Sequence, residues 1–158
     1  MAKKLAVTIA GAVSLGSYEA GVLWEILDAI RQHNLSPKTL PDDKIVIDVI
    51  TGASAGGMTA VILAQKLLYS GGEFKGPSDN PLYNTWVKGI SLAGLQNTGR
   101  EENALQSVFS SDLIKTISEQ LIMARYKNGA PPPAVAHPAV DSQLSVGVAL
   151  TRFKGRGA

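Results

Sequence analysis

The feature that most constrains the fold is a serine between two glycines, directly after an apolar run. Residues 45–50 are almost continuously apolar and predict a parallel strand that is covered on both faces. The sequence Gly-Ala-Ser-Ala-Gly follows at residues 52–56, and the apolar pattern after it predicts a helix. A serine at a sharp turn between a strand and a helix has the geometry of a nucleophile elbow. We therefore predict that Ser54 is a nucleophile, and that Gly52 and Gly56 are required where the two backbones approach closely.

The remaining pattern predicts an α/β fold with a mostly parallel sheet. Residues 4–10 and 144–150 have the apolar or alternating pattern of two further strands. Helices are expected over residues 17–33, 55–70, 82–95 and 111–126, and loops over residues 11–16, 35–44, 71–81 and 128–133. Strands and helices that alternate in this way predict a three-layer sandwich around one sheet.

The length of the chain fits one domain with a core of its own. The chain has 158 residues, which is enough for one such domain and too few for two. The last expected strand is followed only by a short segment that contains glycine and basic residues, without a covering helix. We therefore interpret residues 1–158 as the N-terminal part of one incomplete domain.

Composition excludes several classes of protein. The net charge is +2, and so small a basic excess does not indicate nucleic-acid binding. The sequence contains no cysteine, which excludes disulfides and thiolate metal sites. Its two histidines, His33 and His137, are not accompanied by a carboxylate cluster, so we expect no metal site.

The N-terminal residues have the outline of a signal peptide, because two lysines precede an apolar stretch. Thr8 and Gly11 interrupt that stretch, and its pattern fits a buried strand and a turn better. The apolar helix over residues 55–68 is too short to span a bilayer. We therefore expect no signal peptide, and a location in the cytoplasm or at the surface of a membrane.

Two loops are expected at the same edge of the sheet. Residues 11–16 follow the first strand and residues 52–56 follow the second, and ligands of open α/β sheets bind beyond the carboxyl ends of the strands. Backbone amides at the start of a helix form an anion site. We predict an oxyanion hole beside the serine, whose amides come from Gly11, Ala12, Val13, Ser14 and Ala55.

The two loops together carry a family resemblance. The sequence Gly-Ser-Tyr-Glu-Ala-Gly-Val-Leu at residues 16–23, followed later by Gly-Ala-Ser-Ala-Gly-Gly at residues 52–57, resembles the patatin-like phospholipases. Residues 80–87 and 146–151 are also similar to bacterial members. The resemblance implies an α/β lipid acyl hydrolase of the phospholipase A or lysophospholipase type, with a serine–aspartate dyad and no cofactor. It also implies a lipid or acyl-ester substrate and peripheral contact with a membrane.

The sequence departs from the family pattern at three points. Ala12 and Val13 stand where the family usually has glycines, and Leu15 stands where it usually has arginine or lysine. The Asp-Gly-Gly or Asp-Gly-Ala turn that carries the family's catalytic aspartate does not occur. Asp112 and Asp141 are poor substitutes. The resemblance therefore implies that the aspartate lies outside this chain.

Three alternatives remain open from the sequence. The chain could be a fragment without activity, or a pseudoenzyme that binds lipid without hydrolysing it. Residues 49–56 also resemble the nucleotide-binding loop of short-chain dehydrogenases, although Met58 takes the place of that loop's last glycine and the Tyr-x-x-x-Lys pair is absent. Finally, His137 could serve as the base for Ser54 in a triad.

Overall fold

The computed structural model describes residues 1–11, 15–91, 115–117, 119 and 135–149. Its sheet has three strands in the order β1-β2-β3, with β1 at Lys3–Ile9, β2 at Ile45–Ala53 and β3 at Val140–Ala149. Both pairs of neighbours are parallel, so the carboxyl ends of all three strands meet at one edge. At that edge Gly52 pairs with Ile9 on one side and with Val148 on the other.

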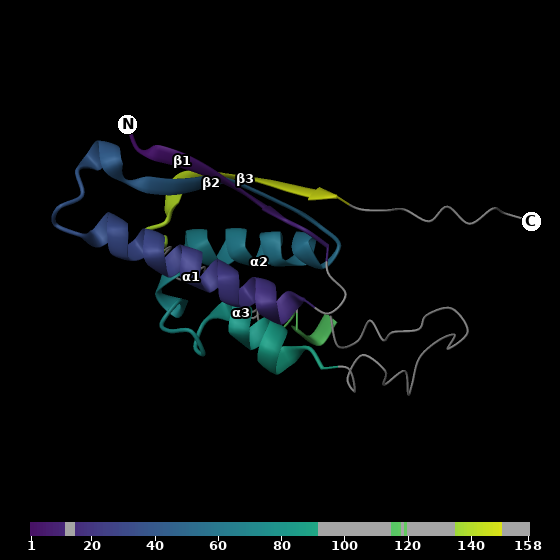
Figure 1. The fold of residues 1–158 in the computed structure, drawn as a ribbon. Helices are drawn as coiled ribbons and strands as arrows, with labels where there is room; N and C mark the ends of the chain where they lie inside the picture. Colours follow the sequence, from purple (N-terminus) through teal and green to yellow (C-terminus); the bar gives the residue numbers. More distant parts are fainter. Residues whose placement is uncertain (12–14, 92–114, 118, 120–134, 150–158) are drawn as a thin grey trace, which may run out of the picture.

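The helices lie on one side of this sheet (Figure 1). They are α1 (Gly16–Leu35), α2 (Ala55–Tyr69) and the short α3 (Pro81–Tyr83), which continues into the π-helical turn η3 (Asn84–Gly89). Two further turns, η1 (Pro41–Asp43) and η2 (Gly71–Glu73), connect the larger elements. The predicted α/β class and the parallel sheet are confirmed, and the described residues contain one of the helical layers of the expected sandwich.

The core lies between the sheet and these helices. The buried stripe of α1 recurs at helical spacing, whereas α2 is apolar on most of its surface because it packs under the middle of the sheet. The core side chains of the two helices are Ala20, Leu23, Trp24, Leu27, Ile30, Ala60, Leu63 and Leu67. They meet Ile9, Ile47 and Ile50 from the strands. Burial of this apolar surface is the main force that holds the helices to the sheet.

Several boundaries differ from the sequence prediction. The helix expected over residues 82–95 begins earlier, because Asn80 accepts a hydrogen bond from the Tyr83 backbone and Pro81 takes the first helical position. It also ends earlier, since Ile90 already has an extended backbone. The third strand begins at Val140 rather than at residue 144, and β2 continues to Ala53, into the glycine-serine turn. Most of the helix expected over residues 111–126, and the loop over residues 128–133, lie outside the described residues.

The amino-terminal edge of the sheet is tied together by buried and exposed polar contacts. Asn34 is buried at the end of α1, and its side-chain amide donates to the carbonyls of Ile45 and Pro138 at 2.6 and 2.8 Å. Its carbonyl oxygen accepts from the Ile45 amide at 2.9 Å. One side chain thus joins α1, the start of β2 and the segment before β3.

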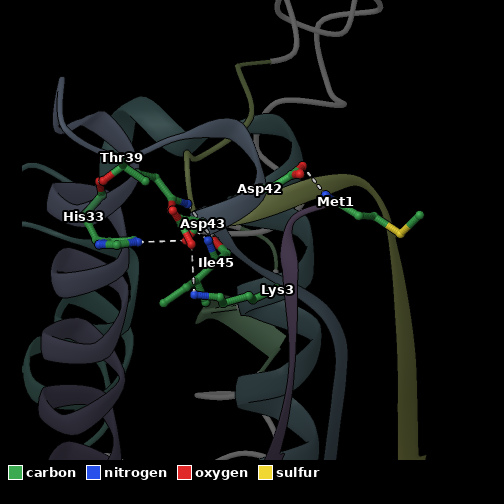
Figure 2. A network of polar contacts seen from close by, with 8 residues as sticks. Met1, Lys3, His33, Thr39, Asp42, Asp43 and Ile45 are labelled. Carbon is green, nitrogen blue, oxygen red and sulfur yellow. Dashed lines mark hydrogen bonds and ion pairs between the residues drawn. The ribbon is translucent and has the colours of Figure 1, made fainter.

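An exposed network continues this tie beside the start of β1 (Figure 2). Asp43 accepts from the Lys3 ammonium at 3.2 Å through its carboxylate, and its backbone carbonyl lies 2.9 Å from the His33 ring. The Thr39 hydroxyl donates to the His33 carbonyl at 2.6 Å, and the Met1 ammonium contacts Asp42. Exposed ion pairs of this kind contribute little individually, so the buried Asn34 is the stronger anchor of this edge.

Candidate active site

The corner between β2 and α2 holds Ser54 in a strained backbone conformation. Its φ is 53° and its ψ is −124°, and it is the only residue other than glycine with a positive φ among those described. Such conformations cost about 1–3 kcal/mol and persist only where the surrounding structure enforces them. The Ser54 side chain is exposed and makes no capping hydrogen bond to α2. The hydroxyl is therefore presented to solvent and is not used to stabilise its own helix.

Two glycines allow the chain to turn this sharply. A Cβ atom at Gly52 would lie 2.2 Å from the Gly56 carbonyl oxygen and 2.7 Å from the Gly57 nitrogen. A Cβ atom at Gly56 would lie 2.3 Å from the Ala10 carbonyl oxygen. Real side chains do not fit at such distances from rigid backbone atoms. At both positions the strand and helix backbones are therefore too close for any residue except glycine.

The corner after β1 lies against the corner after β2. A Cβ atom built on Gly11 would lie 3.2 Å from the Ser54 Cβ and 3.2 Å from the Ala53 carbonyl oxygen. Gly11, Ser54 and Ala55, the first residue of α2, are thus brought together. The other residues expected in the oxyanion hole, Ala12, Val13 and Ser14, lie outside the described residues.

Two helices begin at this same edge of the sheet. The residues that precede them, Leu15 before α1 and Ser54 before α2, make no side-chain capping hydrogen bonds. The first backbone amides of a helix have no partner within the helix, and the helix dipole places partial positive charge on them. The α2 helix has 15 residues, and the glycine pair in its first turn packs closely against Ala10 and Val148. This arrangement can stabilise developing negative charge next to Ser54.

An open pocket of about 420 Å³ lies at the same edge. It is formed by the last residues of the three strands, at positions 8–10, 51–53 and 147–149. Small side chains and glycines form most of this lining, and its two hydroxyl groups, those of Thr8 and Thr51, are hydrogen-bonded to each other at 3.0 Å. The pocket therefore offers space and apolar surface, and the lining supplies no titratable group.

The structure places His137 far from this edge. The residue is buried just before β3, and its backbone amide donates to the Leu67 carbonyl near the end of α2. Leu67 is separated from Ser54 by most of that helix, or about 20 Å at 1.5 Å per residue. The His137 Nδ1 accepts from the Ala139 amide at 3.1 Å, and its ring meets the Phe74 ring at a centroid distance of 5.2 Å. The alternative in which His137 is the base for Ser54 is therefore wrong.

The environment of His137 also keeps its imidazole neutral. Burial lowers the pKa of His137 to about 4, and the positive charge of Arg31 acts in the same direction. The charge of Asp28 acts in the opposite direction but is the smallest of the three effects. His137 is thus a packing residue that accepts a hydrogen bond.

The structure does not place Asp141 or Asp112, the two aspartates considered as a substitute base, at the site. Asp141 lies at the start of β3, whereas Ala149 at the other end of that strand pairs with Ala53 beside the serine. Asp112 lies outside the described residues. In the described part of the chain, no group of three or more histidine, aspartate or glutamate side chains could hold a metal ion. None of the helices described has the length and apolar content needed to span a bilayer.

Sequence reasoning missed an apolar groove whose strand wall ends at Ala10, the residue before Gly11. It lies between β1 and α1 and includes Val22 and Ile26. These two residues are one turn apart and flank the buried stripe of α1, so their spacing resembles that of core residues. Their partial exposure could not be read from the spacing alone.

The family model described as Patatin-like phospholipase matches residues 7–149, which include both corners, α1, α2 and β3. Comparison with curated proteins and with solved structures gave no significant match. The family match favours the acyl-hydrolase interpretation of residues 49–56 over the dehydrogenase-like alternative.

Proposed function

Because the chain belongs to the patatin-like phospholipase family, whose members are typically lipid acyl hydrolases, we propose that it hydrolyses carboxylic esters of lipids with Ser54 as the nucleophile. The observation that carries this proposal is the backbone of Ser54. An exposed serine with a φ of 53° sits at the uncapped start of α2 and against Gly11 of the neighbouring corner. Strain of this kind concentrates at functional sites, because it holds a reactive group in a fixed orientation.

In this proposal Ser54 Oγ attacks the carbonyl carbon of the ester while its proton passes to a general base. The tetrahedral intermediate collapses when the bond to the alcohol oxygen breaks, and the base returns the proton to that oxygen. Water then attacks the acyl-enzyme, which releases the fatty acid and restores the serine. The base in this proposal is the aspartate of a Ser–Asp dyad. That aspartate is proposed to lie outside residues 1–158.

The oxyanion in this proposal is held by backbone amides from the two corners. The donors are the amides of Gly11, Ala12, Val13, Ser14 and Ala55. A single donor of this type stabilises the transition state by about 3–4 kcal/mol. The contact between Gly11 and Ser54 supports this assignment, because it brings the two corners within reach of one ester group.

The test of this function is hydrolysis of p-nitrophenyl butyrate by the full-length protein. We expect Ser54→Ala to lower kcat/KM by at least about a thousandfold, because the covalent route is lost. Ser78→Ala, at an exposed serine away from the corner, is the matched control and should leave kcat/KM unchanged. Equal turnover by Ser54→Ala and Ser78→Ala would exclude Ser54 as the nucleophile.

A second candidate function is lipid binding without hydrolysis. Leu15 supports it, because this residue is 57% exposed at the start of α1, where the family usually has a basic side chain. An exposed leucine adds apolar contact with lipid and removes a positive charge from the site. Sedimentation with phosphatidylcholine vesicles, combined with the absence of ester turnover by the full-length protein, would favour this function over catalysis.

A further inference from the structure

Strand β2 contains one extra residue near its middle, at Asp48. Ile47 and Ile50 are both buried in the core, at 2% and 0% exposure, although residues three positions apart in a regular strand point to opposite faces. The register explains this, because β1 advances by one residue where β2 advances from Ile47 to Val49. Asp48 therefore forms a β-bulge, which turns the rest of β2 over to the opposite face.

This bulge decides which residues of the two corners lie opposite each other. Beyond it Ile9 pairs with Gly52, and two residues further along the two chains are Gly11 and Ser54. The structure has these two in contact, because a Cβ on Gly11 would lie 3.2 Å from the Ser54 Cβ. If the register at the start of β1 continued without the bulge, Gly11 would instead lie opposite Ala53. The two corners would then be one residue out of step.

An ion pair joins the bulge to β1. The Lys4 ammonium lies 3.0 Å from the Asp48 carboxylate, whose side chain is only 23% exposed. The hydrogen bond and the charge of Asp48 raise the pKa of Lys4, and the charge of Asp141 on β3 acts in the same direction. Bulges between parallel strands are rare, and the extra residue has no partner in the ladder of hydrogen bonds. The ion pair therefore gives the bulged residue a partner on the neighbouring strand.

We propose that Asp48, through its ion pair with Lys4, is a positioning residue for the reaction at Ser54. It fixes the bulge in β2 and thereby aligns the two corners. Asp48 lies roughly 20 Å before the serine along the strand, so it acts through the backbone and contacts neither the hydroxyl nor the ester. This inference rests on the proposed function for the chemistry, and on the register of the strands for the alignment.

The test removes one charge of the pair in the full-length protein. Asp48→Asn keeps the size of the side chain and removes its charge, and Lys4→Gln removes the opposite charge. Lys3→Gln is the matched control, because Lys3 lies on the same strand and forms an exposed ion pair with Asp43 at 3.2 Å (Figure 2). Lys4→Glu combined with Asp48→Lys restores an ion pair with the charges exchanged. Urea unfolding verifies that each variant is folded under the assay conditions.

We expect kcat for p-nitrophenyl butyrate to fall about tenfold in Asp48→Asn and in Lys4→Gln, with KM within about twofold of the unmodified protein. The loss falls on kcat because misaligned donors weaken contacts that are made in the transition state and leave ester binding intact. The exchanged pair should recover about half of the lost kcat, because the two substitutions compensate each other. Lys3→Gln should leave kcat unchanged.

A second measurement follows the register itself and needs no activity. Thr8 and Thr51 are paired across β1 and β2 beyond the bulge, with their hydroxyls 3.0 Å apart. Neighbouring strands lie about 4.8 Å apart, which suits a disulfide between these positions. Residues 1–158 contain no cysteine, so Thr8→Cys with Thr51→Cys gives a crosslink under mild oxidation that peptide mapping identifies. Adding Asp48→Asn should slow its formation at least about threefold, and adding Lys3→Gln should not.

The outcomes separate this inference from the proposed function. If the ester is hydrolysed and kcat is the same in Asp48→Asn and Lys3→Gln, Asp48 is not a positioning residue. If kcat falls but the disulfide forms equally fast in both backgrounds, or the exchanged pair recovers no activity, Asp48 does not act through this register and the inference is wrong. If no ester is hydrolysed yet Asp48→Asn alone slows the disulfide, the alignment by the bulge stands and the proposed function fails.

Discussion

At the scale of single residues, the decisive conformation is that of Ser54. A serine at a φ of 53° and a ψ of −124° occupies a region that glycine adopts readily and other residues do not. The backbone strain therefore lies at the position where the proposed chemistry needs an exposed hydroxyl. This interpretation can be tested through stability alone.

We expect Ser54→Gly to be more stable than Ser54→Ala, by about 1 kcal/mol in the free energy of unfolding. Glycine relieves the backbone strain, whereas alanine removes the hydroxyl and retains the strain. Urea denaturation of the two variants measures the difference. A Ser54→Gly variant no more stable than Ser54→Ala would mean that the corner is not strained in solution.

Gly56 gives a second prediction at this scale. A Cβ there meets the backbone carbonyl of Ala10 at 2.3 Å, so Gly56→Ala should lower the free energy of unfolding by about 3 kcal/mol. Gly21 is the control, because it lies inside α1 with nothing within 4 Å of the added atom. Gly21→Ala should stabilise the protein by about 1 kcal/mol. Similar unfolding midpoints for the two variants would contradict the close approach of β1 and α2.

At the scale of elements, the sequence allowed prediction of the parts whose pattern is local. The apolar run before residue 52 and the glycines at 52 and 56 predict a strand, a turn and a helix, and the structure has β2 and α2 there. The helix expected over residues 82–95 is shorter because its end depends on tertiary contacts, such as the packing of the Trp86 ring against Gly16 of α1. No local pattern encodes such a contact.

Long-range polar ties were equally invisible in the sequence. Asn34 reads as one polar residue near the end of a helix, yet it accounts for three hydrogen bonds to two other segments. His137 was considered only as a possible base for Ser54, yet it is buried because the segment before β3 packs onto the end of α2. Both cases depend on chain segments that are distant in sequence.

The buried His137 makes stability depend on pH. Well above pH 6.5 the imidazole is neutral in both the folded and the unfolded chain. As the pH falls from 6.5 to 4, His137 binds a proton in the unfolded chain but not in the folded chain. This difference lowers the free energy of unfolding by up to about 3 kcal/mol. We expect His137→Asn, whose side-chain oxygen can accept from the Ala139 amide, to lose less stability than the unmodified protein between these pH values. The free energy of unfolding of both proteins is measured by urea titration at pH 7 and at pH 4.5. If the two proteins lose the same free energy of unfolding between these pH values, His137 is not the source of the pH dependence.

At the scale of the whole molecule, the two edges of the sheet have different roles. The amino-terminal edge is fastened by Asn34 and by the contacts of Asp43 with Lys3 and His33. The carboxyl edge has two uncapped helix starts, an open pocket and the strained serine. The family match over residues 7–149 extends across both edges. The polar ties and the candidate site thus lie at opposite edges of the sheet.

The measurement that tests the central claim most directly is the mapping of a fluorophosphonate label on the full-length protein by peptide mass spectrometry. The account predicts one modified serine, Ser54, and loss of the label in Ser54→Ala but not in Ser78→Ala. A label that persists in Ser54→Ala, or that maps to another residue while Ser54 stays unmodified, would contradict it.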